Sequence, residues 1–199
     1  MSLHLLKKLL SVIIPPRSSE RDVEALTVEE LFDLQTSQGL PYANNIVRSL
    51  VWELKYHANP RAAALAGELL AEELLAIASE ELGKPLLIPM PMHRIRIRER
   101  GHNHTAFLCT SALTHLGDVY EYAPESLKRT RYTPEQQKLS RSERLVNLKN
   151  SMQASPQVRG RVCVVVDDVT TTGATLAEAA RALKAAGAAR VHTIALAQS

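Results

Sequence analysis

The apolar residues of this 199-residue chain follow two spacings that alternate along the sequence. Apolar residues three or four positions apart predict helices at about 43–57, from Pro60 to near Gly83, at about 103–116 and at 174–186. Short runs of apolar, β-branched residues predict strands at 86–91, 119–123 (the weakest), 161–166 and 190–197. Strands that alternate with helices favour a parallel sheet flanked by helices, so the sequence predicts an α/β fold.

The first 40 residues follow a different pattern. A leucine-rich stretch, Leu3 to Leu10, predicts a short amphipathic helix that ends before Pro15. Residues 17–40 are polar and acidic, and Val28–Leu34 is the one brief stretch in which a helix is expected. We therefore divide the chain into an N-terminal helical segment, residues 1–40, and a main domain, residues 41–199.

The net charge of +3 hides an uneven distribution of charged residues. Residues 93–104, in which Arg alternates with Ile, carry four Arg against one Glu, and residues 127–150 carry seven Lys or Arg against two Glu. Residues 18–36 carry six acids against one Arg. The scarcity of large apolar residues in 127–150 predicts a long loop with a short helix at its end. Basic stretches of this kind suggest polyanionic ligands.

Composition argues against several classes of protein. Cys109 and Cys163 form no CxxC pair and lie in apolar stretches, so we expect inert core thiols, not a disulfide or a zinc site. The apolar stretch 3–14 contains two lysines, is too short to span a bilayer and precedes no small-residue cleavage site. We therefore expect a cytoplasmic protein with no membrane partner.

Residues 163–175, with the sequence CVVVDDVTTTGAT, carry the strongest chemical signal. The expected strand leads into two carboxylates, Asp167 and Asp168, and a turn rich in Thr and Gly leads into the expected helix. The N-terminus of a helix has free N–H groups and partial positive charge, which suit a phosphate. Carboxylates beside it suit sugar hydroxyls or a magnesium-bound ligand. The pattern therefore predicts a site for a phosphorylated ribose.

Other interpretations of the two acids have less support. A Walker B strand also ends in acids, but the chain has no GxxxxGK[ST] loop. The aspartyl-phosphate nucleophile of certain phosphatases needs a differently spaced acid pair. Simple capping of the helix by Asp and Thr is a further alternative. Three consecutive threonines exceed what capping needs, and Gly173 would let a ligand approach the backbone closely.

The same thirteen residues closely resemble the signature of type I phosphoribosyltransferases (PRTases), which bind phosphoribosyl pyrophosphate (PRPP). From about Leu40 to Ala197 the chain resembles the ComF branch of that superfamily. The matching positions are 50–56 (LVWELKY), 89–94 (PMPMHR), 98–101 (RERG), Asn103, Arg129, Arg131, Thr133, Gln136, Leu139, Arg144 and Asn147. The resemblance implies that residues 41–199 form a PRTase domain with the type I fold, a parallel sheet flanked by helices.

The resemblance also implies site residues. Asp167 and Asp168 would engage the ribose 2′- and 3′-hydroxyls, and residues 171–175 would hold the 5′-phosphate. The implied PRPP-binding residues are Asp167, Asp168, Val169, Thr170, Thr171, Thr172, Gly173, Ala174 and Thr175. Met92, His93 and Arg94 would form a pyrophosphate loop. Magnesium would bridge the pyrophosphate and the ribose hydroxyls, with no metal site built by the protein.

The chain departs from the ComF pattern at two places. ComF proteins usually carry an N-terminal four-cysteine zinc module, but Ser18 and Ser19 stand where its first cysteine is expected, so we expect the zinc site to be missing. His102 and His104 replace the usual aromatic residue and glutamine. The two histidines could be a metal pair, but a surface or hydrogen-bonding role fits better because no further His or Cys lies at ligand spacing.

The basic residues have three interpretations. They could form a mobile hood over the pyrophosphate, track a nucleic-acid backbone, or simply be a solvated charged face. The candidates for the first two roles are Arg98, Arg100, Arg129, Arg131 and Arg144, with Arg94 and Arg96 beside them in sequence. Binding of single strands also needs exposed aromatic rings, for which Tyr120, Tyr122 and Tyr132 are the nearest candidates. We expect Trp52 and Tyr56 to be buried in helix packing.

Two functions follow from the resemblance. The first is a PRTase that transfers phosphoribosyl from PRPP, with Mg²⁺, to a nitrogenous acceptor, although no residue stands out as a general base. The alternative is a non-catalytic PRPP- or nucleotide-binding accessory protein of DNA uptake that binds single-stranded DNA. The acceptor and the oligomeric state, including a homodimer, stay open.

Overall fold

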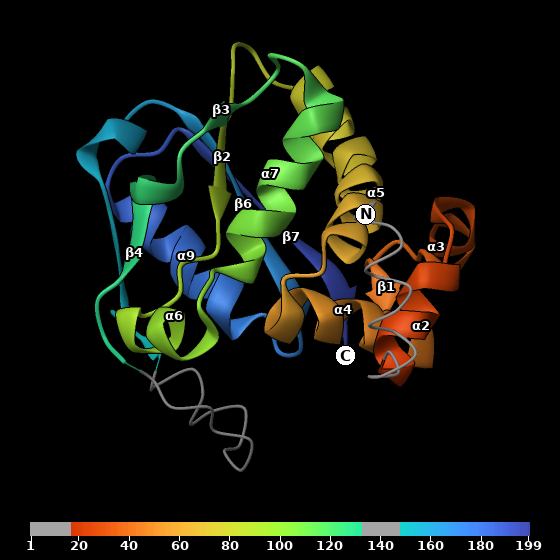
Figure 1. The fold of residues 1–199 in the computed structure, drawn as a ribbon. Coiled ribbons are helices and arrows are strands. Elements are labelled where there is room, and N and C mark those ends of the chain that lie inside the picture. The colour runs from red at the N-terminus through yellow and green to blue at the C-terminus, as the bar shows by residue number, and fades with distance from the viewer. Residues whose placement is uncertain (1–16, 133–147) are drawn as a thin grey trace, which may run out of the picture.

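The computed structural model describes residues 17–132 and 148–199, which fold around a parallel sheet of five strands (Figure 1). The order across the sheet is β1-β7-β6-β2-β3, and every neighbouring pair is parallel. The strands are β1 Leu40–Pro41, β2 Leu86–Pro89, β3 Glu121–Tyr122, β6 Val162–Thr170 and β7 Arg190–Gln198. The expected α/β class with a parallel sheet is confirmed.

Helices cover both faces of the sheet because alternate strand residues point to opposite sides. On one face, Val164 and Val166 of β6 join the core of α4 (Asn45–His57), α5 (Pro60–Ser79) and α7 (His104–Leu116). On the other face, Cys163 and Val165 pack with α9 (Ala174–Ala185). A small antiparallel sheet, β4 (Leu127–Arg129) with β5 (Met152–Ala154), lies beside α9. Both faces are therefore buried, as a parallel sheet requires.

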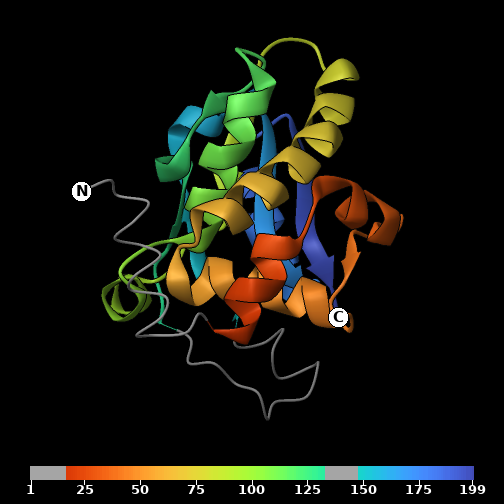
Figure 2. The same cartoon turned by 45° about the vertical axis from the view of Figure 1, so that its right-hand side comes forward.

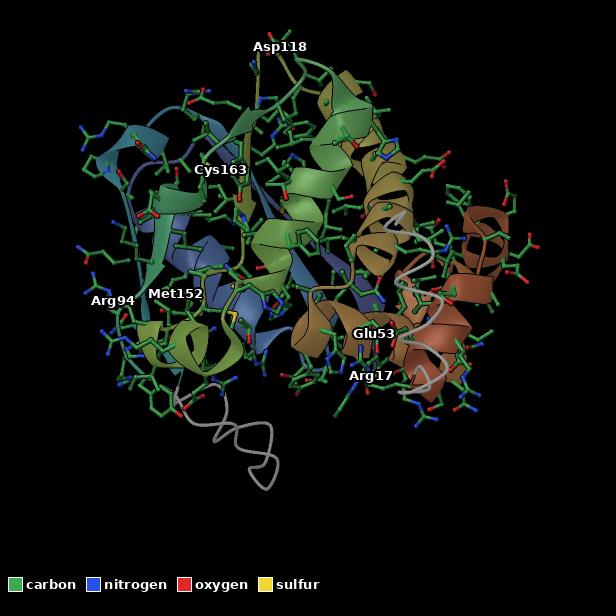
Figure 3. All side chains as sticks on the ribbon, viewed as in Figure 1. Arg17, Glu53, Arg94, Asp118, Met152 and Cys163 are labelled. Carbon is green, nitrogen blue, oxygen red and sulfur yellow. The ribbon has the colours of Figure 1, made fainter. Side chains whose placement is uncertain are left out.

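The N-terminal helices α2 (Ser18–Ala25) and α3 (Val28–Leu34) pack at the β1 edge of the sheet (Figure 2). The prediction for α3 is confirmed; Thr27 and Glu30 form a capping box that starts it. The prediction missed α2, which the fully buried carboxylate of Glu53 in α4 anchors. Glu53 accepts hydrogen bonds from Ser19, at 2.7 Å, and from Arg17, at 3.2 Å (Figure 3). Tertiary contacts, not helical periodicity, stabilise α2.

Predicted and observed elements differ mainly in the basic stretches. The alternating Arg and Ile of 93–101 form a helix, α6 (Arg94–Arg100), with His93 as its N-cap and Gly101 left-handed at its C-cap. The expected loop 127–150 begins with a strand, β4, because these residues pair with β5. Short 3₁₀ helices follow β3, at Pro124–Ser126, and β5, at Pro156–Val158. The short helix expected near the end of 127–150 falls largely outside the described residues, as does the helix at Leu3–Leu10.

The main helices and strands otherwise lie close to their predicted positions. α5 ends at Ser79, four residues before Gly83, and β6 continues past 166 to Thr170. Both cysteines are buried and free, and burial raises the pKa of the Cys163 thiol to about 11. Within residues 17–132 and 148–199, no helix has the length and apolar character needed to cross a membrane.

Candidate functional site

A cleft of about 550 Å³ lies at the carboxyl ends of β2 and β6. From β2 the chain continues through α7 to β3, the neighbour of β2 toward one edge of the sheet. From β6 it continues through α9 to β7, the neighbour of β6 toward the opposite edge. The gap between β2 and β6 is therefore the point where the strand order reverses, which is where open α/β sheets bind ligands. Helices α4 and α6 lie beyond these strand ends (Figure 1).

Both acids of the 163–175 segment lie in this cleft, inside β6 and not after it. Asp167 is 9% exposed and Asp168 is 5% exposed. Because neighbouring strand residues point to opposite faces, Asp168 points toward α4 and α7 while Asp167 points toward α9 and β4. The main-chain N–H of Asp168 also donates to Oδ1 of Asp167 at 2.9 Å.

Asp168 is held by two basic side chains from distant parts of the sequence. Nζ of Lys55 in α4 lies 2.5 Å from Asp168 Oδ2, and Nε2 of His104 in α7 lies 3.4 Å from the same oxygen. Burial opposes ionisation of Asp168, but the hydrogen bond from His104 and the charge of Lys55 outweigh it and lower the pKa of this carboxyl. Asp168 is therefore ionised at neutral pH.

Asp167 has the opposite electrostatic environment. Burial and the adjacent charge of Asp168 raise the pKa of Asp167 to about 8. At neutral pH the unliganded pair therefore carries close to one negative charge, and its one proton resides mainly on Asp167. A cation or hydroxyl donors arriving beside Asp167 would favour release of that proton.

The turn between β6 and α9 supplies the second half of the site. Thr171, Thr172, Ala174 and Thr175 line the cleft. Gly173 is the N-cap of α9 and has a φ of +72°. Because glycine has no side chain, the N-cap residue makes no side-chain hydrogen bond to the first N–H groups of the helix. Thr172 Oγ1 accepts a long hydrogen bond of 3.4 Å from the Ala174 N–H. A helix N-terminus of this kind can bind an anion.

The basic residues of α6 divide between two faces of that helix. Met92 and His93 line the cleft, but Arg94 is exposed and lies outside its lining, as its outer position in Figure 3 shows. Arg96 and Arg100, from the other face of α6, line the cleft together with Arg129 of β4. Arg98 and Arg131 are exposed outside the lining, and Arg144 lies beyond the described residues. Val169 lines the cleft, whereas Thr170 and Gly173 do not.

A family model described as "Phosphoribosyl transferase domain" matches residues 115–199, which include β6, the Thr-rich turn and α9. The chain is also similar to the "DNA utilization protein YhgH" of Salmonella typhi, with 36% identity over 146 residues. It is 32% identical over 116 residues to "Competence protein F" of Haemophilus influenzae.

Together these matches support the assignment of this chain to the ComF-type branch of the phosphoribosyltransferase superfamily.

Each alignment covers only part of this chain and part of the relative. The match with the Salmonella typhi protein spans 72% of this ComF-type chain but 63% of that relative, and the match with Competence protein F spans 57% and 50%. The chain thus spans under two thirds of the length of the curated relatives. No cysteine precedes Cys109 in this chain, so residues 1–108 contain none of the four thiolates of a ComF zinc module.

Solved structures with a similar arrangement include a hypoxanthine phosphoribosyltransferase from Staphylococcus aureus, with a TM-score of 0.43 and 12% identity. That similarity covers 68% of this chain and 65% of the other. A phosphoribosylpyrophosphate synthetase from Mycobacterium smegmatis has a TM-score of 0.40 and 21% identity, over 67% and 33% of the two chains. The fold assignment rests on the sheet topology and on the family model matched at residues 115–199: the parallel sheet with helices on both faces is the type I PRTase fold that the resemblance implied.

The ComF-type cleft contains basic side chains whose role the sequence did not reveal. Lys55 lies in the segment 50–56, which matches the family pattern without pointing to a function for the lysine. His104 does form a polar contact, with Asp168, while the ring nitrogens of His102 lie 3.1 Å from the Arg100 carbonyl oxygen and 3.0 Å from that of Leu54. The acid pair in a buried strand is a sequence signal that could have pointed to a basic partner such as Lys55, because a buried carboxylate needs a compensating charge.

The aromatic residues correct an expectation. Trp52 and Tyr56, expected in helix packing, are 51% and 41% exposed and line the cleft. Tyr120, one of the candidates for an exposed stacking ring, is buried, and its hydroxyl donates to the Leu74 carbonyl at 2.7 Å. The buried residues of α4 lie on a different face of that helix from Trp52 and Tyr56, so α4 presents these two rings at the rim of the cleft. Tyr132 is 38% exposed and lies edge-on to His93.

Proposed function

We propose that the cleft binds PRPP together with Mg²⁺ and that the protein transfers the phosphoribosyl group to a nitrogenous acceptor. One observation carries the proposal. The acid pair of β6, the uncapped turn before α9 and three arginines line a single cleft at the switch point of the sheet. These groups match, in order, the hydroxyls, the 5′-phosphate and the pyrophosphate of PRPP.

The carboxylates suit the ribose and the metal. Asp167 and Asp168 offer acceptors for the 2′- and 3′-hydroxyls, and hydrogen bonds to a charged carboxylate contribute about 1.5–3 kcal/mol each. Among the described residues, no group of three or more His, Cys, Asp or Glu could hold a metal ion. Mg²⁺, which binds through few carboxylates plus substrate oxygens, would therefore enter with PRPP and neutralise charge on its pyrophosphate.

The phosphate groups at the two ends of PRPP need different partners. Thr171, Thr172 and Thr175 with the N–H groups at the N-terminus of α9 suit the dianionic 5′-phosphate. The guanidinium groups of Arg96, Arg100 and Arg129 would face the pyrophosphate. Met92 and His93 of the implied pyrophosphate loop line the same cleft, whereas Arg94, the third residue of that loop, lies outside the lining.

The proposed reaction is a substitution at C1 of the ribose. The nitrogen of the acceptor forms a bond to C1, the bond from C1 to the pyrophosphate oxygen breaks, and the nitrogen loses a proton. The chain would contribute by holding the two reactants in line and by stabilising the departing negative charge with its arginines. No side chain in the cleft is assigned as a general base.

Calorimetry tests the binding step directly. We expect PRPP to bind in the presence of Mg²⁺ and to bind much more weakly in EDTA, because the metal neutralises the pyrophosphate. Ribose 5-phosphate and pyrophosphate alone should each bind more weakly than PRPP. Absence of any binding heat up to millimolar Mg²⁺–PRPP would refute the proposal. Release of pyrophosphate with added nucleobases would then test catalysis.

Gly173→Ala tests the phosphate turn. Gly173 has a φ of +72°, and among the described residues, its two chain neighbours aside, no atom lies within 4 Å of the place that an alanine methyl would take. Alanine would therefore suffer backbone strain but no collision. We expect a loss of about 1–2 kcal/mol in the free energy of unfolding. PRPP affinity should fall roughly tenfold, because the turn would shift by enough to lose one charge-assisted bond.

Gly160→Ala is the matched control. Gly160 has a φ of +71° and equally open surroundings, but it precedes β6 at the opposite end of that strand. The two variants should lose similar stability in urea, and only Gly173→Ala should lose PRPP affinity. Equal affinities would show that the turn does not contact the ligand.

A second candidate function is binding of single-stranded DNA, which the exposed basic face of α6 favours. Arg94 and Arg98 are exposed beside the cleft, and the relatives bear the names DNA utilization protein and Competence protein F. We expect an oligonucleotide to bind in a salt-dependent manner. Neutralising both residues (Arg94→Gln with Arg98→Gln) should reduce the slope of log K against log salt by about 1.4.

The control for this experiment is Arg159→Gln with Lys184→Gln, which removes two exposed charges at the far end of the sheet. It should leave the slope unchanged, and neither double variant should alter PRPP binding. A slope that is the same for the α6 variant and the wild type would remove α6 as a DNA contact.

A further inference from the structure

Helix α9 carries a buried carboxylate outside the acid pair. The side chain of Glu178 is 5% exposed, and charged side chains are seldom this buried unless they are paired. Arg181, one turn further along α9, donates to both carboxylate oxygens of Glu178, at 2.8 and 3.0 Å. Burial opposes ionisation of Glu178, but its hydrogen bonds from Arg181 and from the main chain of β5 outweigh burial and lower the pKa of this carboxyl. Glu178 is therefore ionised at neutral pH.

The ion pair with Arg181 does not explain why Glu178 is buried. Two side chains three residues apart on a helix can pair equally well in solvent, and burying a charge costs free energy. The further partner of Glu178 is the main-chain N–H of Met152 in β5, which donates to Oε1 at 3.3 Å (Figure 3). Glu178 thus joins α9 to the small antiparallel sheet.

Met152 stands directly opposite Arg129, the arginine of β4 that lines the cleft. In the next residue pair, the Thr130 N–H donates to the Ser151 carbonyl at 2.9 Å, so the Met152 N–H points away from β4 and toward α9. Three residue pairs join β4 to β5, and a two-stranded sheet of this size is marginally stable by itself. The place of Arg129 therefore depends on how β5 is held against α9, and Glu178 makes a polar contact between them.

Glu178 also acts on the charge of Arg129. Burial lowers the pKa of the Arg129 guanidinium; the negative charges of Asp167 and Glu178 act against that shift, and the positive charge of Arg96 adds to it. A carboxylate on this side of Arg129 thus favours a charged guanidinium at the wall of the cleft.

We propose that Glu178 is a positioning residue that holds Arg129 where it can bind the pyrophosphate of PRPP. This inference rests on the proposed PRPP site. Helix α9 begins at the turn proposed for the 5′-phosphate, so Glu178 ties the arginine at the pyrophosphate end of the cleft to the helix at the other end. Ribose 5-phosphate by itself would use only the turn, whereas pyrophosphate by itself would use only the arginines.

Calorimetry with these separate ligands tests the role of Glu178. Glu178→Ala should weaken the binding of Mg²⁺–PRPP and of Mg²⁺–pyrophosphate about tenfold, as for the loss of one charge-assisted hydrogen bond. Its affinity for ribose 5-phosphate should stay within about twofold of the wild type, because groups that share no contact act independently. In an Arg129→Gln background, Glu178→Ala should cause no further loss of pyrophosphate affinity, because the positioned group is already absent.

Glu178→Gln separates the carboxylate charge from the hydrogen bond to β5. The amide keeps an oxygen that can accept from the Met152 N–H but loses the charge that pairs with Arg181. Its affinity for pyrophosphate should therefore fall by only about threefold, because a neutral acceptor makes a weaker bond than a charged one. Its affinity for ribose 5-phosphate should be unchanged.

Glu81→Ala is the matched control. The Glu81 side chain is also 5% exposed and pairs with Arg190 and His192, each at 2.7 Å, but it does so at the amino end of β7, opposite the cleft. The two alanine variants should lose similar amounts of melting temperature, and only Glu178→Ala should lose pyrophosphate affinity. Hydrogen exchange of residues 127–130 and 151–154 should also be faster in Glu178→Ala than in Glu81→Ala.

The outcomes separate this inference from the proposed function. If the wild type binds neither PRPP nor pyrophosphate, the proposed function fails and the inference fails with it. If the wild type binds both and Glu178→Ala binds them equally well, only the inference fails. Equal losses for pyrophosphate and ribose 5-phosphate would show that Glu178 supports the whole cleft, which also overturns the inference. If Glu178→Ala does not fold, the selective loss expected of Glu178→Gln decides.

Discussion

Asparagine in place of Asp167 is expected to stabilise the unliganded protein at neutral pH while weakening Mg²⁺-dependent PRPP binding at least tenfold. Burial and the charge of Asp168 raise the pKa of Asp167 to about 8, so ionising this carboxyl destabilises the folded protein. Asparagine resembles the protonated acid and avoids that cost. It also removes one charged acceptor for the ribose hydroxyls or the metal, which contributes about 1.5–3 kcal/mol to binding.

The sign of the pH dependence follows from linkage. The pKa of Asp167 is about 8 in the folded protein, against an ordinary value of 3.8. The folded state therefore binds more protons than the unfolded state between these values, and the unfolding free energy falls as pH rises from about 4 to about 8. Asp167 contributes up to about 1.4 kcal/mol per pH unit to that fall. Asp167→Asn should lack this contribution.

Urea unfolding of wild type and Asp167→Asn at several pH values between 5 and about 8.5 measures the difference. Asp167→Asn should have a higher unfolding free energy than wild type at pH 8, and the difference between the two proteins should be larger at pH 8 than at pH 5. Asp118→Asn is the control, because the Asp118 side chain is 97% exposed and pairs only at the surface with Lys84. Parallel pH profiles for wild type and Asp167→Asn would contradict the assignment.

Lys55→Met is expected to cause the largest loss of stability of any change in the cleft. Lys55 lies 2.5 Å from the buried Asp168, and its own side chain is 22% exposed. Removing one partner of a buried ion pair leaves an uncompensated charge and costs about 3–5 kcal/mol. For a chain of this length the melting temperature should fall by about 6–20 °C. Calorimetric or circular-dichroism melting measures the loss.

The control for Lys55→Met is Lys128→Met, which breaks the Lys128–Glu125 pair, with side chains 63% and 79% exposed. Its effect should stay within about 1 kcal/mol. Millimolar Mg²⁺ should recover more stability in Lys55→Met than in wild type, because a cation beside Asp168 replaces the lost ammonium. Equal effects of the two lysine substitutions would show that the Lys55–Asp168 pair is not buried as described.

Local patterns predicted the elements whose stability is largely local. The Asn59-Pro60 start of α5, the apolar run of β2 and the β6–α9 segment contain their own caps, turns and periodicity, and each lies near its predicted place. α2 escaped prediction because Glu53 anchors it from another helix. β4 was not predicted because its hydrogen bonds are made with β5, which lies beyond the basic stretch in the sequence.

The α6 region shows a local pattern that did not predict the element it forms. Arg at every second position alternates like a strand, but His93 and Gly101 cap a helix there. In a helix, residues two apart point to different sides, so Arg96 lines the cleft while Arg94 and Arg98 do not. The phase of that helix, set by its caps and by packing, decided which arginines line the cleft.

The sequence by itself determined the parallel α/β class, the acid pair and the Thr- and Gly-rich turn, because residues 163–175 are contiguous and need no distant partner to be recognised. Only the tertiary structure decided the charge state of that pair and the rest of the cleft. Lys55, His104, Arg96 and the rings of Trp52 and Tyr56 come from separate helices, and chain folding alone brings them to the end of β6. Burial and proximity, which no local pattern encodes, then lower one pKa and raise the other.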